Sequence, residues 1–356
     1  MNANLRQEKF TGTKEVQSHL RFNEEILISW MEKHIPSFHG PITVSEFKGG
    51  QSNPTYSIVS PTGSYVLRRK PPGELLPSAH AVDREFRVIS GLHEQGFPVP
   101  KPYNLCEDVD ILGTMFYVME KVEGRIFWEM SLPDVEPMER NAIYEAQLKT
   151  LTDLQKIDYS QAGLNGFGKT ADYMARQIYR WTKIYTASET AKIAEMDSLN
   201  RWLPDNIPHS NETCIIHGDY RLDNIIIHPT KPQVLAVLDW ELSTLGDPLA
   251  DFVYHMAPWF LPTTDERIST LNGLNLKQLG IPEEEEYISR YCELMERDMI
   301  ENLNFYKAYT LWRVAAIYQG IAKRVLDGTA ASADANQDTD IIQLFARKAW
   351  EFAKSC

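Results

Sequence analysis

Residues 217–224 place several polar side chains between two apolar segments of the chain. His217, Asp219 and Asn224 lie within HGDYRLDN, which isoleucines precede and follow, and a further carboxylate, Asp239, ends the apolar run VLAVLD downstream. Two carboxylates and an amide form an oxygen-rich set, and Mg²⁺ prefers oxygen ligands and keeps phosphate and water in its shell. The set lacks the histidine and cysteine mixture of zinc sites. The sequence also contains no G-x-S-x-G nucleophile motif.

The spacing of these residues matches the catalytic loop of protein kinases. That loop runs H-R-D-L-x-x-x-N and is followed by a metal-binding Asp. His217, Asp219 and Asn224 stand at the same offsets, and Asp239, in D-W-E, takes the place of the Asp of D-F-G. A histidine-glycine-aspartate triplet alone carries little information, but its combination with the later Asn and Asp indicates phosphoryl transfer.

The first third of the chain has the pattern of an antiparallel sheet with a helix. Residues 44–60 read as strand, turn and strand, and residues 64–70 read as a further strand. Apolar side chains recur at spacings of three or four within residues 79–96, which predicts a helix there. Residues 113–124 predict another strand, which ends at a glycine.

Helical patterns dominate the remainder of the chain. Strand signals are confined to CII, NIIIH and VLAVLDW, which predict one small sheet around the polar stretch. We therefore predict an α+β protein with an N-lobe, residues 1–122, and a mainly helical C-lobe, residues 123–356. The helices expected in the C-lobe cover residues 135–157, 171–187, 190–203, 263–278, 283–296, 298–323 and 338–354.

A glycine-containing turn in the first third is the candidate phosphate-binding loop. Kinases place such a turn over the phosphates of ATP, and glycines allow backbone N–H groups to approach phosphate oxygens closely. A plain hairpin turn explains the same residues. The candidate residues within FKGGQSNPTY are Gly49, Gly50, Ser52 and Asn53.

The next strand and helix supply candidates for a cation and its carboxylate partner. Alternation along YVLR places Arg68 where kinases carry the Lys that binds the α- and β-phosphates. Arg keeps the charge and adds a planar fork, and the neighbouring Arg69 and Lys70 are alternatives. Glu85 is the first candidate for the carboxylate and Asp83 the second, although ordinary surface charge explains both.

The segment YVMEKVEG is the expected connection between the lobes. Backbone groups of Glu120 and Val122 are candidates for hydrogen bonds to adenine, and the Met119 side chain is a candidate for the wall of the base pocket.

Taken together, these motifs resemble the aminoglycoside phosphotransferase/choline kinase family, which has a protein-kinase-like fold. The resemblance rests on H-G-D-x-x-x-x-N, D-W-E and GDPLADF, and it extends from about Phe47 to Arg324. The segments VLRRKPPGELLPSAHAVDREFRV and FYVMEKVEGRIF resemble the kinase-like domains fused to some acyl-CoA dehydrogenases. The resemblance implies a bilobal kinase fold, ATP and Mg²⁺ as cofactors, and transfer of the γ-phosphate to a hydroxyl of a small molecule. A hydroxyacyl-CoA is one such acceptor.

The resemblance also implies a role for each residue of the loop. Asp219 aligns the attacking hydroxyl or accepts its proton, and Asn224 and Asp239 bind Mg²⁺. Arg221 is expected at the γ-phosphate, with a surface arginine as the alternative. His217 is expected to brace the loop through backbone hydrogen bonds. Asp219 could instead form its own turn, and Asn224 and Asp239 could be a buried hydrogen-bonded pair.

The sequence does not identify the acceptor site, and it leaves two other functional classes as alternatives. Aromatic and basic residues after Phe252 are candidates for the acceptor wall, and helical core packing explains most of them equally well. A protein kinase is one alternative, although no A-P-E motif follows at a suitable distance, and a catalytically silent nucleotide-binding regulator is another. The candidate acceptor residues are Tyr254, His255, Trp259, Tyr309 and Arg313.

Charge and composition exclude some partners. The formal net charge of -13 argues against a nucleic-acid or anionic-membrane partner, because both require a basic surface. The four cysteines show no metal-binding or C-x-x-C spacing, which favours a reducing compartment. Neither an apolar signal core nor a run of transmembrane length is evident, so we expect a cytoplasmic protein without a membrane span.

Overall fold

The computed structural model describes residues 11–48, 53–73, 80–210, 212–262, 268–328 and 339–356. The chain divides into two compact units. The first comprises Met1–Trp128, Ile157–Phe167 and Arg221–Ser243, and the second comprises Glu129–Lys156, Gly168–Tyr220 and Thr244–Cys356. Residues 221–243, which carry Asn224 and Asp239, thus group with the N-terminal sheet, whereas the sequence assigns them to the C-lobe. The lobes proposed for residues 1–122 and 123–356 stay a prediction.

The first unit is built on an antiparallel sheet with strand order β1-β2-β3-β4-β6-β5. The expected strand, turn and strand over 44–60 form β2 and β3, which pair from Thr43 opposite Val59 to Glu46 opposite Tyr56. The strands are β1 Thr13–Lys14, β2 Thr43–Phe47, β3 Thr55–Ser60, β4 Gly63–Arg69, β5 Pro102–Cys106 and β6 Phe116–Glu120.

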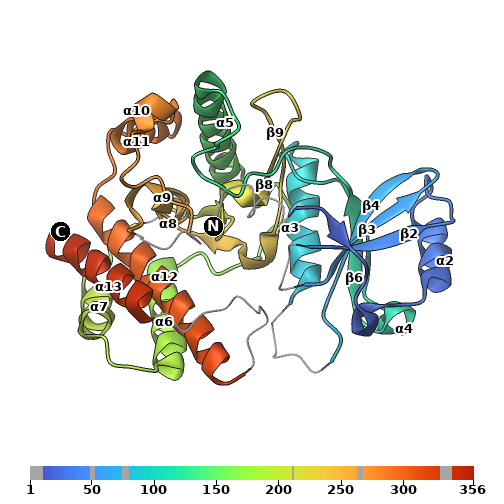
Figure 1. Ribbon diagram of the computed structural model, residues 1–356, viewed down its shortest axis with the longest axis horizontal. Coiled ribbons are helices and arrows are strands. Elements are labelled where there is room, and N and C mark those ends of the chain that lie inside the picture. Colours follow the sequence, from blue (N-terminus) through green and yellow to red (C-terminus); the bar gives the residue numbers. More distant parts are fainter. Residues whose placement is uncertain (1–10, 49–52, 74–79, 211, 263–267, 329–338) are drawn as a thin grey trace. The chain divides into compact units, whose positions relative to one another are not determined.

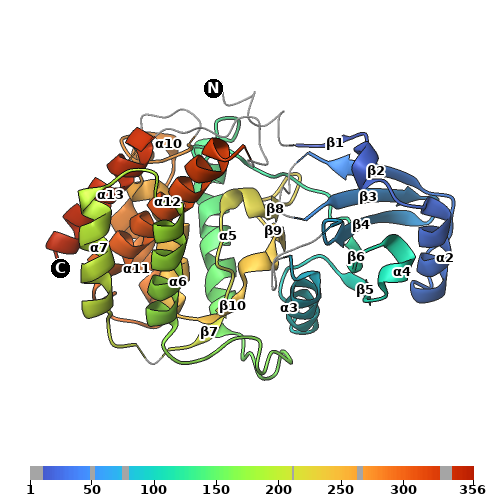
Figure 2. The ribbon, with the colours of Figure 1, turned by 90° about the horizontal axis from the view of Figure 1, so that it is seen from below.

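Helices cover both faces of this sheet (Figures 1 and 2). Alternate residues of β6 serve the two faces: Phe116 and Val118 belong to the apolar core formed with α2, Glu24–His34, and α4, Val109–Leu112. Tyr117 points to the other face, where its ring lies 5.8 Å from Phe86 of α3, Val82–Glu94. The central strands β4 and β6 are therefore buried on both sides over most of their length, and α3 presents its inner face to them.

A short hairpin completes the first unit. β8, Ile225–Ile227, pairs with β9, Val234–Val237, and the 3-10 turns η2, Leu222–Asn224, and η3, Trp240–Leu242, flank the hairpin. The Val237 N–H donates to the Pro98 carbonyl at 2.9 Å, which ties β9 to the segment after α3.

The second unit is helical, with α12 at its centre. The side chains of α12 are buried on nearly all sides between Phe305 and Ala316, as expected of a helix enclosed by others, and Figure 2 shows α13 and α6 beside it. The helices are α5 Pro137–Lys156, α6 Tyr173–Ser188, α7 Ala194–Asp205, α8 Pro248–His255, α9 Ala257–Phe260, α10 Leu276–Leu279, α11 Glu284–Leu294, α12 Leu303–Leu326 and α13 Thr339–Lys354.

Two sequence-based expectations for this region are wrong. The single small sheet is in fact two: β8 pairs with β9, and β7, Cys214–Ile216, pairs with β10, Thr244–Gly246, a strand that the sequence pattern did not predict. The helix expected over 263–278 is reduced, within the described residues, to the single turn of α10. There, the N–H groups of Leu271 and Asn272 donate to the Pro258 carbonyl at 2.8 and 3.1 Å, so they are not available for hydrogen bonds within a helix.

In the described parts of the chain, no helix combines the length and the apolar character needed to cross a bilayer. The α+β class is as predicted.

Candidate active site

The loop after β7 is held by one buried carboxylate of α8. Asp251 accepts the His217 N–H at 2.7 Å and the Gly218 N–H at 2.8 Å, one on each oxygen. Gly218 has φ of 84°, a left-handed conformation that glycine adopts without strain. The Asp219 N–H donates to His217 Nδ1 at 3.2 Å, so His217 braces the loop as expected. The backbone N–H groups of three successive residues, His217, Gly218 and Asp219, are thus hydrogen-bonded.

Burial raises the pKa of Asp251, and the nearby His217, the two N–H donors and Arg313 oppose this effect. A carboxylate that is 2% exposed is tolerated because its oxygens receive backbone N–H groups. The aspartate within GDPLADF was the available signal for Asp251 in the sequence, but its hydrogen-bond partners lie more than thirty residues away.

The Asp219 carboxylate has a side-chain partner in the same unit. The Tyr254 hydroxyl donates to Asp219 Oδ1 at 2.7 Å. The Arg313 guanidinium lies 4.7 Å from the Tyr254 ring and donates to the Gly218 carbonyl at 2.9 Å. Tyr254 and Arg313, expected in the acceptor wall, therefore contact the loop that carries Asp219.

The other residues expected in the acceptor wall are core residues. His255 bonds the Tyr287 hydroxyl at 2.8 Å, and the Trp259 indole donates to the Pro282 carbonyl at 2.9 Å. Tyr309 is 1% exposed. Core packing, the alternative considered for these aromatic residues, accounts for all three.

The two candidate metal ligands lie at adjoining ends of the β8–β9 hairpin in the first unit, Asn224 directly before β8 and Asp239 shortly after β9. The Leu238 N–H donates to the Asn224 carbonyl at 2.8 Å, which brings Asn224 beside the residue before Asp239. Asp239 has φ of 65°, an uncommon conformation for a non-glycine residue and one found at functional sites. The Trp240 indole donates to the Val237 carbonyl at 3.0 Å and anchors the backbone on either side of Asp239.

Arg221 lies between these two groups of residues in the sequence. Its side chain is 48% exposed and pairs with Asp223 at 2.5 Å. This geometry resembles the surface arginine considered above, and a contact with the γ-phosphate remains a prediction.

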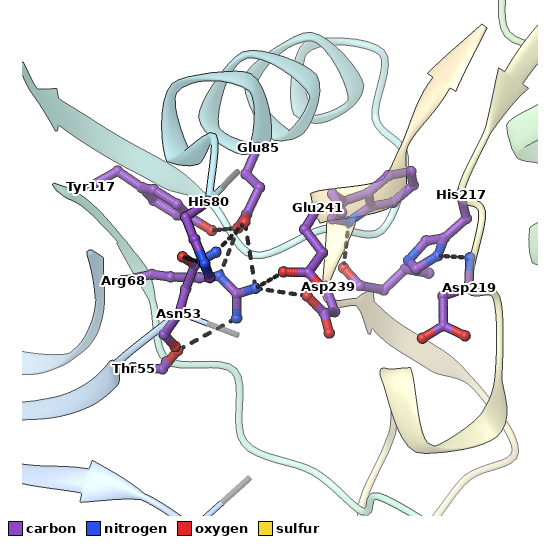
Figure 3. Close-up of polar contacts among 12 residues, drawn as sticks. Asn53, Thr55, Arg68, His80, Glu85, Tyr117, His217, Asp219, Asp239 and Glu241 are labelled. Atoms are coloured by element: carbon purple, nitrogen blue, oxygen red, sulfur yellow. Dashed lines mark hydrogen bonds and ion pairs between the residues drawn. The ribbon is translucent and has the colours of Figure 1, made fainter. Parts of the chain in front are cut away.

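Arg68 is the centre of a buried polar network (Figure 3). Its Nε lies 2.7 Å from Glu85 Oε2, and its Nη2 lies 2.7 Å from Asp239 Oδ1 and 3.6 Å from Glu241 Oε2. Burial alone would lower the pKa of Arg68, but Glu85 and Asp239 raise it above its ordinary value. Arg68 is therefore a permanent cation that joins β4, α3 and Asp239, the second residue after β9, and its planar fork makes this bridge possible.

The alternatives to Arg68 and Glu85 have other partners. Arg69 is buried and donates to the carbonyls of Leu112 and Leu20. Lys70 lies 3.8 Å from Asp83, whose side chain is 43% exposed. The first choices from the sequence are thus the pair that the fold brings together.

Further residues hold Glu85 in place. The Tyr117 hydroxyl donates to Oε2 at 3.0 Å, and Asn53 Nδ2 donates to Oε1 at 2.9 Å. Asn53 Oδ1 lies 3.1 Å from His80 Nδ1, and the Asn53 side chain is fully buried. Asn53 thus supports the carboxylate, and the structure gives it no exposed surface for phosphate. The other turn candidates, Gly49, Gly50 and Ser52, lie outside the described residues.

The segment after β6 has geometry relevant to the base pocket. The Glu120 N–H donates to the Lys101 carbonyl at 2.8 Å, so this N–H is engaged within the sheet. Met119 is 7% exposed and Val122 is partly exposed. The Glu120 carbonyl and the Val122 N–H are the backbone groups that remain candidates for adenine.

The donor set suits a hard cation held together with phosphate. Among the residues that the structure describes, no group of three or more His, Cys, Asp or Glu forms a metal cage. Mg²⁺ needs only one or two protein oxygens when phosphates complete its shell. The side-chain oxygens of Asn224 and Asp239 stay the candidates for this role, and Mg²⁺ bound there would neutralise charge on the phosphates.

Comparison with known proteins gives matches over most of the chain. Residues 43–286 match the model of the phosphotransferase enzyme family. Acyl-CoA dehydrogenase family member 10 of Mus musculus is 48% identical over 314 residues, which cover 88% of this chain and 29% of that protein. Acyl-CoA dehydrogenase family member 11 of Homo sapiens is 40% identical over 346 residues, covering 96% and 44%. The chain spans less than half the length of these curated relatives.

Solved structures agree with the expected fold. A crystal structure from Ralstonia eutropha, assigned as an aminoglycoside phosphotransferase, is 46% identical and superposes with a TM-score of 0.86, covering 94% of this chain and 99% of that one. A thermostable mutant of aminoglycoside phosphotransferase APH(4)-Ia, in complex with ADP and hygromycin B, has a TM-score of 0.57 at 14% identity, covering 93% and 98%. At that identity the likeness shows the fold alone. These matches confirm the protein-kinase-like α+β fold.

Proposed function

Because the chain belongs to the phosphotransferase enzyme family, we propose that it transfers the γ-phosphate of ATP to a hydroxyl of a small molecule. The observation that carries the proposal is the Arg68 network. In kinases a strand cation must pair with a helix carboxylate while the Asp after the catalytic loop binds metal. Here Arg68 contacts both Glu85 and Asp239 at 2.7 Å. Two solved structures with the same fold contain ADP or GDP, and a nucleotide is the ligand that we propose for this chain.

Each candidate site residue has a role in the proposed transfer. Asp219 aligns the acceptor hydroxyl and takes its proton while the acceptor oxygen bonds to the γ-phosphorus and the bond to the ADP oxygen breaks. Asn224 and Asp239 hold Mg²⁺, and Arg68 contacts the phosphates. The remaining proposed contacts are Arg221 at the γ-phosphate, Gly49, Gly50 and Ser52 at the phosphates, Asn53 and Glu85 behind Arg68, and Met119, Glu120 and Val122 at the adenine.

The relatives suggest the class of acceptor. The matching segments of the curated relatives belong to proteins named as acyl-CoA dehydrogenase family members. A kinase-like segment in such a protein is consistent with an acceptor derived from an acyl-CoA, and we propose a hydroxyacyl-CoA as the first compound to test.

The test is Mg²⁺-dependent ATP consumption with a library of hydroxyl compounds that includes hydroxyacyl-CoA thioesters. We expect turnover with at least one compound, and we expect Asp219→Asn to abolish it while Mg-ATP binding, followed by calorimetry, is retained. Asp153→Asn is the matched control, because Asp153 is exposed on α5 and pairs with Lys149 of the same helix. Equal turnover in the wild type and Asp219→Asn would refute the assigned role.

The same assay separates the other classes. A generic protein substrate is included as an acceptor, and phosphorylation of that substrate in place of every small alcohol would identify a protein kinase. Mg-ATP binding without turnover on any acceptor would identify a silent regulator.

A further inference from the structure

Tyr254 lies outside every motif that identified the site, yet it contacts the proposed catalytic carboxylate. It is near the end of α8, and its hydroxyl donates to Asp219 Oδ1 at 2.7 Å. A hydrogen bond from a neutral hydroxyl to a carboxylate is charge-assisted and is stronger than a neutral pair. The side chain is partly exposed, so core packing alone does not explain its position.

Arg313 holds the Tyr254 ring and the loop backbone together. Its guanidinium lies 4.7 Å from the Tyr254 ring and 5.4 Å from the Trp181 ring, and its Nη2 donates to the Gly218 carbonyl at 2.9 Å. The cation is attracted to the aromatic faces. Because Arg313 binds the residue before Asp219 as well as the ring of Tyr254, the phenol and the carboxylate are positioned by one rigid group.

A carboxylate needs such a partner to keep one orientation. The last torsion of an aspartate is broad and roughly two-fold, so the backbone alone does not set the direction of its oxygens. Asp251 fixes the backbone of the loop, whereas the Tyr254 hydroxyl contacts the side chain itself. These are two separate requirements for directing an oxygen of Asp219 at a hydroxyl.

The geometry points to Tyr254 as a positioning residue for phosphoryl transfer, one that sets the rotation of the Asp219 carboxylate toward the acceptor hydroxyl. This inference rests on the proposed function, since it assigns Tyr254 to the same transfer step. The acceptor proton passes to Asp219, the acceptor oxygen bonds to the γ-phosphorus, and the bond to ADP breaks. Tyr254 keeps its own proton throughout.

The kinetic test compares Tyr254→Phe with the wild type on the best acceptor from the library. The Phe variant keeps the ring and its contact with Arg313 but loses the hydroxyl. Misplacement of a catalytic group costs about 100-fold in rate, so we expect kcat to fall by about 10-fold to 100-fold with an unchanged KM for Mg-ATP. Tyr185→Phe is the control, because the Tyr185 hydroxyl is buried and has no hydrogen-bond partner among the residues that the structure describes. Its kcat should equal that of the wild type.

A second measurement tests the contact without turnover. Thermal unfolding is followed for Tyr254→Phe, Asp219→Ala and the double variant. We expect Tyr254→Phe to lower Tm in the wild type and to leave it unchanged in the Asp219→Ala background, because its partner is already absent. Additive shifts in Tm would overturn the inference.

The two proposals fail in different ways. A Tyr254→Phe variant with wild-type kcat overturns the positioning role while turnover by the wild type keeps the proposed function. If the wild type phosphorylates no acceptor, the proposed function and the positioning role fail together, and the unfolding measurement then reports only on the hydrogen bond.

Discussion

The substitution Asp251→Asn tests how the loop that carries Asp219 is held. The Asp251 carboxylate accepts two backbone N–H groups, at 2.7 Å from His217 and 2.8 Å from Gly218. Asparagine has nearly the same shape but offers one oxygen and one NH₂ group. Because backbone N–H groups only donate, one of them must lose its acceptor and face another donor.

The size of the effect follows from these two bonds. A hydrogen bond to a charged group contributes about 1.5–3 kcal/mol, and a buried donor without a partner costs about 1–3 kcal/mol. Burial raises the pKa of Asp251, so removal of its charge recovers part of the desolvation cost. We expect a net loss of about 2 kcal/mol in the free energy of unfolding. Since Asp219 follows Gly218 directly, we also expect kcat to fall by about 10-fold to 100-fold.

Asp247→Asn is the matched control on the same helix. Asp247 is also buried, and its carboxylate accepts the Leu249 N–H at 2.8 Å and the Tyr306 hydroxyl at 2.9 Å. Asparagine is as good an N-cap as aspartate, and the Tyr306 hydroxyl can turn to accept from the new NH₂ group. We therefore expect little change in stability or turnover. The difference in stability and turnover between the two variants therefore reports the effect of a backbone N–H that loses its acceptor, because an N–H, unlike a hydroxyl, cannot accept a hydrogen bond.

The assays are urea unfolding, followed by intrinsic fluorescence, and steady-state turnover with Mg-ATP and the best acceptor. Mg-ADP binding by calorimetry should be unchanged in both variants, because neither carboxylate belongs to the proposed nucleotide contacts. If Asp251→Asn and Asp247→Asn were equal in stability and in kcat, our account of the loop would be refuted.

Two further predictions concern buried ionisable side chains, one in each unit. Glu85→Gln should lower the free energy of unfolding by about 3 kcal/mol, because it breaks a buried ion pair with Arg68. Urea unfolding checks this, and an equal loss in the exposed control Asp83→Asn would contradict it. Burial lowers the pKa of His255 from 6.5 to about 4, so the folded state holds it neutral while the unfolded state gains a proton. The free energy of unfolding is therefore highest above pH 6.5. We expect it to decrease by about 3 kcal/mol as the pH falls from about 6.5 to about 4. Urea unfolding across this pH range should show a smaller slope in His255→Gln, and identical slopes would contradict the assignment.

Local patterns in the sequence predicted several features of this protein. Alternation along β4 placed Arg68 on the correct face, because side chains of a strand point to opposite sides in turn. Helical spacing in α3 made both Glu85 and Asp83 candidates for the partner of Arg68. In the structure Glu85 is that partner, and it is only 1% exposed. The spacing of Asp219, Asn224 and Asp239 identified the family because a catalytic loop requires fixed offsets along one segment.

Contacts between distant segments decided the rest. The short strand β10 is defined by its pairing with β7, and within the helix expected over 263–278 the N–H groups of Leu271 and Asn272 donate instead to the distant Pro258 carbonyl. Asp251, Tyr254 and Arg313 support the loop from two helices, and no spacing in the sequence relates them to Asp219. By itself, the sequence determined the elements and the chemistry carried by neighbouring residues, since both depend on local periodicity. Only the tertiary structure determined which groups hold that chemistry in place, because hydrogen bonds and ion pairs depend on distances in space.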